Sequence, residues 1–357
     1  SGGNGIVEST FAAPVLSWEI EKKFNVGVDL GFFDNRIDIT ADYFFNRRED
    51  ILIQRKIVPK TLGFRVNPWQ NFGIVDNKGL DGSLTLNHQF GDLKVSARGN
   101  ITYVRNEIVE YDEVPSKYNY QNYTGQSIGQ PYCYIAEGLY TPDDFTTTTT
   151  STEGYLYELK ADVPKPAANV APGDIKYKDL NGDGLINEYD MTYENGLNST
   201  NPELVYGFGL NLEYKGFFAG IFFQGVGKTT VNLMSNSNYF MPFIRGVEGG
   251  SARMEALSHW SADNPYNQDV LYPRIHAAKF DHNIEKSTWW YRDGSFLRLK
   301  NVEFGYEFSK DMIKKMRMTN LRLYVQGTNL AVWDNIKLWD PELGNSNSGA
   351  KYPLGAT

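Results

Sequence analysis

The chain has 357 residues, of which 41% are hydrophobic and 14% aromatic, and its net charge is −8. This hydrophobic content excludes a disordered chain, and the absence of an apolar run of about 20 residues excludes a transmembrane helix. The negative charge argues against nucleic acid as a partner, and the single cysteine, Cys133, excludes an internal disulfide framework.

The first third of the chain alternates apolar and polar residues over long segments. This period of two predicts β-strands with one apolar and one wet face. We expect strands at about 18–32, 36–50, 73–90 and 93–109. Asp34-Asn35 and Gly91-Asp92 supply tight turns, because these residue types tolerate left-handed backbone.

Two long segments without sustained periodicity, at about 110–202 and 227–293, predict loops. Between them, strands at about 203–214 and 217–226 are joined by a tight turn at Lys215-Gly216. After the second loop we expect strands at about 294–308 and 320–333, joined by a basic segment that could form a helical turn.

Short and long connections therefore alternate along the chain. This pattern, with strands of about ten residues, is typical of a transmembrane antiparallel β-barrel with short periplasmic turns and long extracellular loops. The apolar face would meet outer-membrane lipid and the polar face would line a lumen. Because the first strand would run inward and the last outward, both ends of the chain would lie outside the cell, and we expect the chain to be part of a larger barrel.

Several motifs, in this order and spacing, resemble the C-terminal half of SusC/RagA-type TonB-dependent transporters. The similarity extends over nearly the whole chain. The segments that carry it are residues 27–33 (GVDLGFF), 41–44 (ADYF), 172–184 (PGDIKYKDLNGDG), 201–203 (NPE), 293–302 (DGSFLRLKNV), 327–330 (GTNL) and 340–342 (DPE).

The resemblance implies a large, about 22-stranded barrel of the bacterial outer membrane that is closed by an N-terminal plug. It also implies a SusD-like surface lipoprotein as a partner, energy from TonB through the N-terminal part, and import of oligosaccharides or peptides. Residues 1–357 would form the C-terminal portion of this barrel. The plug and the remaining strands would lie outside the chain, because about eight strands cannot enclose so wide a lumen.

The first long loop contains a pattern of oxygen ligands that is typical of calcium sites. Six positions match positions 1, 3, 5, 7, 9 and 12 of a calcium loop, and Gly184 at position 6 permits the sharp turn. We expect calcium to stiffen the loop; the alternative is an Asx-rich turn without metal. The predicted ligands are Asp179, Asn181, Asp183, the backbone carbonyl of Leu185, Asn187 and Asp190.

The second long loop is rich in large aromatic residues. Trp260, Tyr266 and Tyr272 are candidates for contact with substrate or with the lipoprotein, because rigid aromatic side chains are favoured at interfaces. For 289–291 (WWY) we favour a position at the outer membrane interface, where amphipathic rings collect.

No nucleophile, metal or acid–base constellation supports an enzyme, so we expect a transport protein. The alternative class is a secreted, calcium-stabilised β-sandwich that binds carbohydrate. In a sandwich the apolar faces would pack against each other between two sheets.

Overall fold

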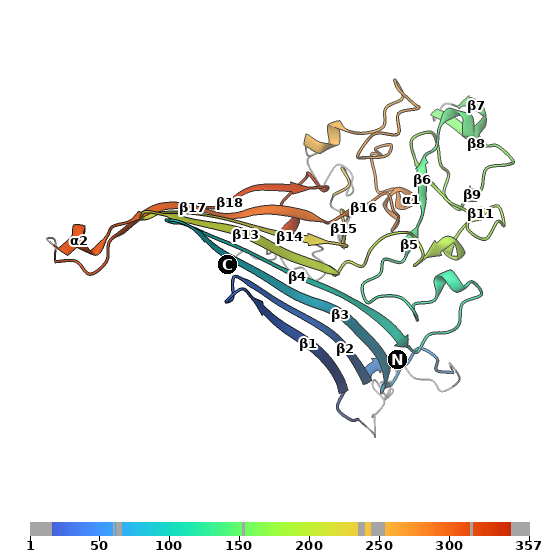
Figure 1. The fold of residues 1–357 in the computed structure, drawn as a ribbon. Coiled ribbons are helices and arrows are strands. Elements are labelled where there is room, and N and C mark those ends of the chain that lie inside the picture. The colour runs from blue at the N-terminus through green and yellow to red at the C-terminus, as the bar shows by residue number, and fades with distance from the viewer. Residues whose placement is uncertain are drawn as a thin grey trace, which may run out of the picture.

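In a computed structural model, the structure describes residues 16–59, 61, 66–151, 154–234, 240–243, 254–314 and 317–343. Its main feature is one eight-stranded antiparallel sheet in which the strands follow each other in chain order (Figure 1). The strands are β1 (Ile20–Phe32), β2 (Ile37–Gln54), β3 (Trp69–Phe90), β4 (Leu93–Glu110), β13 (Leu204–Tyr214), β14 (Phe217–Gly227), β17 (Phe296–Glu307) and β18 (Arg322–Asp334).

All eight expected strands are present. The apolar residues that alternate along the sequence lie opposite one another in the register of the sheet. Directly opposed residues share a face, so one apolar row crosses from Leu30 on β1 to Ile39 and Leu84 on the next two strands. Farther along the sheet, Phe208 of β13 faces Phe223 of β14 on the same side. The predicted apolar face is therefore continuous from β1 to β18.

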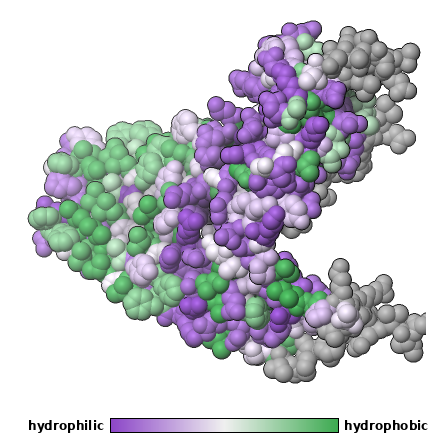
Figure 2. All heavy atoms as spheres, turned by 90° about the vertical axis from the view of Figure 1, so that its right-hand side faces the viewer, coloured by the Kyte–Doolittle hydropathy of each residue, from purple (hydrophilic) through white to green (hydrophobic). Residues whose placement is uncertain are grey.

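The apolar face is exposed. Three of its strand residues illustrate this: the exposed fraction is 57% for Leu80, 58% for Phe304 and 77% for Val325. Exposed apolar surface of this extent marks contact with another hydrophobic phase or partner. Figure 2 shows hydrophobic side chains gathered on one side of the molecule, with hydrophilic residues over most of the rest. The β-sandwich alternative is wrong, because no second sheet among the described residues covers this face.

Aromatic residues mark both ends of the apolar face. On β13, Tyr206 and Tyr214 lie on this face eight residues apart, which is roughly 26 Å along a strand. Phe217 of β14 is directly opposite Tyr214, and its ring centroid is 4.7 Å from that of Tyr306 on β17, the next strand. A strand tilt of about 35–45° reduces the spacing of Tyr206 and Tyr214 to roughly 18–21 Å along the membrane normal, so the two tyrosines fall near the borders of an apolar band about 25 Å tall, where an outer-membrane barrel carries its aromatic girdles.

The connections differ between the two ends of the sheet (Figure 1). At one end the strands are joined by tight turns or by the segment with α2 (Lys310–Ile313). At the other end lie the long connections, which the sequence left without elements and which contain short ones. In 111–203 these are η2 (Asn119–Gln121), β5 (Cys133–Tyr134), β6 (Ala136–Leu139), η3 (Pro142–Asp144), β7 (Phe145–Ser151), β8 (Gly154–Leu159), β9 (Lys165–Pro166), β10 (Ile175–Tyr177), β11 (Leu185–Ile186), η4 (Glu188–Asp190) and β12 (Met191–Thr192). In 228–295 they are β15 (Thr230–Asn232), η6 (Met254–Leu257), α1 (Asp281–Ile284) and β16 (Tyr291–Asp293), and η8 (Pro341–Leu343) follows β18.

We call the described parts of 111–203, 228–295 and 335–343 the loop cap. Its three segments share one hydrophobic core, to which Ile175, Trp290 and Ile336 each contribute a buried side chain. A shared core means that the segments stabilise one another, since each buries apolar area against the other two. The threonines at 146–150 lie in β7, which pairs with β8 in a hairpin.

No helix among the described residues has the length and apolar character needed to cross a membrane. Among the described residues, the sheet begins at β1 and ends at β18 without these two strands pairing.

Candidate functional site

The polar face of the sheet carries charged and amide side chains on most of its strands. Near the tight turns, Lys94 of β4 donates to Glu213 of β13 with an N–O distance of 3.2 Å. On the other side of this region, Arg322 of β18 donates to Glu303 of β17 at 3.0 Å. Such exposed pairs contribute little stability by themselves, about 0–1 kcal/mol. Their main effect is to set the pattern of charge on the polar face of the sheet.

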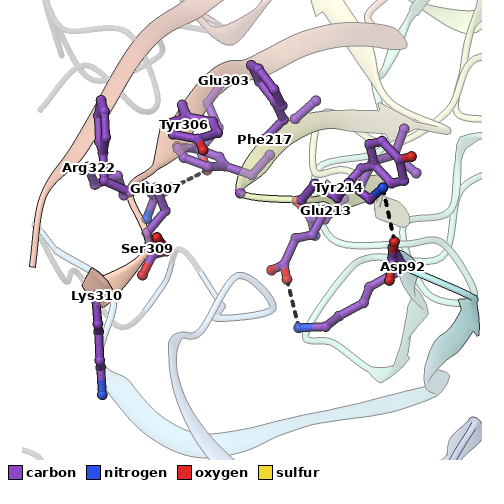
Figure 3. A pocket seen from close by; sticks show the side chains of 18 residues that line it. Asp92, Glu213, Tyr214, Phe217, Glu303, Tyr306, Glu307, Ser309, Lys310 and Arg322 are labelled. Atoms are coloured by element: carbon purple, nitrogen blue, oxygen red, sulfur yellow. Dashed lines mark hydrogen bonds and ion pairs between the residues drawn. The ribbon is translucent and has the colours of Figure 1, made fainter. Parts of the chain in front are cut away.

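A polar hollow of about 540 Å³ lies between these pairs, at the end of the sheet with the tight turns. Figure 3 shows acidic and basic side chains from several strands around it, with the ion pairs drawn as dashed lines. The ion pair of Lys215 and Asp92, at 3.3 Å, joins two of the turns at its rim. This hollow has no counterpart in the sequence predictions, because it depends on which strands meet at the turn end.

The predicted calcium loop is well ordered by its own side chains. Asp179 accepts hydrogen bonds from the backbone N–H of Gly182 at 2.7 Å and of Gly184 at 2.8 Å. Asn181 and Asp183 each accept from the backbone two residues further on, at 2.9 Å. Gly184 has φ +78°, a left-handed conformation that explains the glycine at this position.

Asp190 closes the loop and is the one predicted ligand side chain that is completely buried. Its two carboxylate oxygens accept from the backbone N–H of Leu180 and of Asn187, both at 2.9 Å. Burial raises the pKa of Asp190, the charge of Asp179 adds to this effect, and the backbone hydrogen bonds oppose it. A buried carboxylate close to a second carboxylate is the electrostatic environment that a cation stabilises.

The residues present therefore fit a calcium ion in charge and donor type. No group of three or more His, Cys, Asp or Glu side chains in the described part of the chain is arranged to hold a metal. An ion would thus depend on the amide oxygens of Asn181 and Asn187 and on the carbonyl of Leu185 as well as on carboxylates, which is the mixed oxygen set that calcium accepts.

The calcium loop is attached to a tyrosine-rich segment near η2. Tyr120 Oη donates to the carbonyl of Tyr189 at 2.8 Å, and Gln121 Nε2 donates to the carbonyl of Glu188 at 2.7 Å. The rings of Tyr118 and Tyr120 stack with a centroid distance of 5.2 Å. Sequence analysis missed this attachment, because the partners are almost 70 residues apart in the chain.

The three aromatic candidates lie in different environments. Tyr272 is completely buried in the core of the loop cap, and Trp260 is partly buried against it. The Trp260 ring lies over Gly173, where a Cβ atom would come within 2.2 Å of it. Only Tyr266 is largely exposed, at 55%, and its hydroxyl is 3.3 Å from a carboxylate oxygen of Asp143. The structure thus assigns Tyr272 and Trp260 to packing and leaves Tyr266 at the surface.

The expectation for 289–291 is wrong. Trp290 is 1% exposed and its Nε1 donates to the carbonyl of Asn283 at 2.9 Å, so it lies in the core of the loop cap rather than at a lipid interface. Tyr291 is buried as well, and Trp289 packs against the same core. The aromatic run alone could not distinguish a folded loop from a girdle, since both enrich large rings.

Sequence analysis also missed the polar centre of the loop cap, which is formed by Asp174. This completely buried carboxylate accepts two hydrogen bonds from Arg274, at 2.7 and 3.1 Å, and one from Asn283 at 2.9 Å. His276 Nε2 lies 3.0 Å away. Burial by itself would raise the pKa of Asp174, but the hydrogen bonds from His276 and Arg274 and the Arg274 charge hold it below its usual range. Asp174 thereby connects the two long loops.

The geometry defines a class of protein. A curved antiparallel sheet with a lipid-type face, a polar face and a folded cap of long loops is part of the wall of a large outer-membrane β-barrel.

Comparisons with known proteins agree with this class. No family model matches the chain. TonB-dependent receptor P3 of Formosa agariphila is 28% identical over 359 residues, which cover 96% of this chain and 32% of the relative. TonB-dependent receptor SusC of Bacteroides thetaiotaomicron is 24% identical over 373 residues, covering 96% and 31%. The chain thus spans about a third of the length of the curated relatives it matches.

Among solved structures, the RagAB peptide transporter matches with a TM-score of 0.67 and 24% identity, over 94% of this chain and 34% of the other. The resemblance to SusC/RagA-type TonB-dependent receptors is therefore confirmed, and so is the barrel fold. The protein is an outer-membrane β-barrel protein whose relatives are receptors and transporters rather than enzymes.

Proposed function

We propose that the chain forms part of the wall and the extracellular loops of a TonB-dependent importer of oligosaccharides or peptides, which works with a SusD-like surface lipoprotein. The observation that carries this proposal is the sheet with one apolar and one polar face, together with similarity to TonB-dependent receptors over 96% of the chain. The apolar face meets lipid and the polar face lines the path of the cargo. The neighbour named as a peptide transporter supports peptides as one of the two cargo classes.

The test is deletion of the complete gene in the source bacterium. We expect the deletion strain to lose growth on defined oligosaccharides or on defined peptides as the sole nutrient. The full-length gene should restore this growth, but it should not do so in a strain that also lacks TonB. The partner is tested on the tagged full-length protein, extracted with mild detergent: a surface lipoprotein should copurify in equal amount. Growth on every offered oligosaccharide and peptide at the wild-type rate would contradict the proposed import.

We further propose that the loop 179–190 binds calcium, which orders the loop cap. Two observations support this: the order of the oxygen donors along the loop, and the buried carboxylate of Asp190 beside Asp179. Calcium that binds only the ordered loop stabilises it by about 2.7 kcal/mol at a hundredfold excess over its Kd.

The experiment is calcium titration of the full-length protein, monitored by calorimetry and by hydrogen exchange of the loop cap. Asp179→Asn should weaken binding and remove the calcium-dependent protection of the loop. Glu188→Gln is the matched control, since Glu188 is an exposed acidic residue of the same loop that is not among the predicted ligands. Equal calcium affinity in the wild type and in Asp179→Asn would exclude this site.

A further inference from the structure

The cationic side chains on the polar face of the sheet follow a rule with one exception. Of those that lie within the eight strands, all but one have a carboxylate within ion-pair distance. The pairs are Lys23 with Glu21, Arg48 with Glu19, Lys94 with Glu213, Arg298 with Asp340 and Glu342, and Arg322 with Glu303. The exception is Arg98 of β4, for which no ion pair exists among the described residues. Its side chain is exposed on the polar face.

The Arg98 side chain is nevertheless held in place by an aromatic ring. Its guanidinium lies over the ring of Phe222 on β14, 5.2 Å from the ring centroid. To reach this ring, Arg98 crosses β13 at Gly209, the residue directly opposite it in the register. The ring itself lies along the wall, because a Cβ atom at Gly209 or Gly207 would be 2.9 Å from it. The glycines thus leave room for a flat stack of arginine on phenylalanine.

The residues around this stack are uncharged. Thr85 is the other residue opposite Arg98, and Asn301 is opposite Phe222. Ser96 and Asn100 flank Arg98 on the same face of β4. Stacking on a ring fixes the plane of a guanidinium without neutralising its charge, and it leaves the N–H groups at the edge available as a planar fork. That fork matches a carboxylate.

We propose that Arg98 binds a carboxylate in the assembled transporter. This inference rests on the proposed function, in which the polar face lines a lumen. The carboxylate belongs either to the cargo, for example the C-terminus of a peptide, or to another part of the same protein that enters the lumen. In both cases Arg98 is the strand residue on this face that holds an anionic group, whereas the other cations of the strands on this face are paired with carboxylates of the chain itself.

The test compares the full-length wild type with Arg98→Gln and with the matched control Arg322→Gln. Arg322 also lies over a phenylalanine ring, that of Phe218 at 3.8 Å, but it is paired with Glu303. The probe is a tryptic digest of casein, offered as free acids and as fully amidated peptides, with bound peptides counted by mass spectrometry. A structure of the full-length protein, purified from outer membranes, provides the second measurement.

If the cargo supplies the carboxylate, the wild type and Arg322→Gln retain the free acids about tenfold better than the amides, and Arg98→Gln loses this preference. If the protein supplies it, the pools bind alike, but a carboxylate of the same protein lies within about 4 Å of the Arg98 guanidinium. Equal binding of both pools to all three proteins, with no carboxylate at that distance, overturns the proposal. Because the second measurement does not depend on import, a failed growth test and a failed Arg98 test are distinguishable.

Discussion

Apolar side chains of the eight-stranded sheet remain exposed, whereas those of the loop cap are buried among themselves. Val325 in the sheet is 77% exposed, and Trp290 and Tyr272 in the cap are 1% and 0% exposed. The sheet therefore depends on lipid and on the rest of the barrel for its stability, while the cap has a hydrophobic core and a buried polar centre of its own. One chain thus combines a surface adapted to a membrane with a body that follows the rules of water-soluble domains.

The largest effect is expected from placing a charge on the lipid-facing side of the sheet. Phe208 lies on the apolar face and stacks on Phe223 with a centroid distance of 5.0 Å. We expect Phe208→Arg to cost up to about 2–4 kcal/mol, the cost of an arginine at the middle of the bilayer, and less the closer Phe208 lies to the interface. Loss of the aromatic pair adds about 0.5–1.5 kcal/mol. The amount of folded full-length protein in the outer membrane measures the effect.

The matched control is Asn211→Arg, which adds the same charge to the polar face of the same strand. Normal membrane levels of the Phe208 variant would show that this face does not meet lipid. Val95→Arg, also on the apolar face, should behave like the Phe208 variant.

In the loop cap, the next largest effect is expected from removing the buried charge of Asp174. Asp174→Asn leaves Arg274 without its carboxylate, and we expect the cap to lose about 3 kcal/mol, because Arg274 is only partly buried. Hydrogen exchange of residues in the two long loops measures this loss. Asp143→Asn, an exposed acidic residue of the same cap, should change the exchange by less than about 0.5 kcal/mol. Similar exchange in both variants would contradict a central role for Asp174.

This contrast also explains how much the sequence could predict. The strands were predictable, because a period of two persists over each of them and one face of each meets lipid. All eight expected strands form within a few residues of their predicted bounds. The cap was not predictable, because its core joins residues such as Ile175, Trp290 and Ile336 that are distant in the chain and follow no period.

The same limit applies to the candidate site. The calcium loop is local, so its donors could be read from 179–190. The partners of Asp174 could not, since Arg274 and Asn283 lie about 100 residues later and carry no spacing signal. The stacking of Arg98 on Phe222 could not be predicted either, because it depends on the register that brings Gly209 and Phe222 beside Arg98 from other strands.

A smaller effect, confined to the cap, is expected from pH. Because the pKa of Asp190 is raised in the metal-free loop, protons compete with calcium for this carboxylate at a higher pH than for an ordinary aspartate. Calcium affinity should therefore be highest at neutral pH, where Asp190 is deprotonated. It should fall as the pH drops through this raised pKa, by at most about tenfold per pH unit for one proton. Calorimetric titrations between pH 7.5 and pH 4.5 measure the slope. An affinity that stays constant over this range would exclude Asp190 as a ligand, and Asp190→Asn should bind more weakly without the slope.

The smallest effect should come from the attachment of the calcium loop to η2. Tyr120→Phe removes the hydroxyl that donates to the carbonyl of Tyr189, which costs about 1 kcal/mol. If the attachment holds the loop in its calcium-binding form, calcium affinity should fall by up to about fivefold. Tyr118→Phe is the control, because it keeps the ring that contacts both Tyr120 and Tyr189 of the loop, whereas no hydrogen bond from the Tyr118 hydroxyl to the loop exists among the described residues. An equal loss in both variants would trace the effect to the tyrosine stack, and no loss in either would show that the calcium loop orders independently of the rest of the cap.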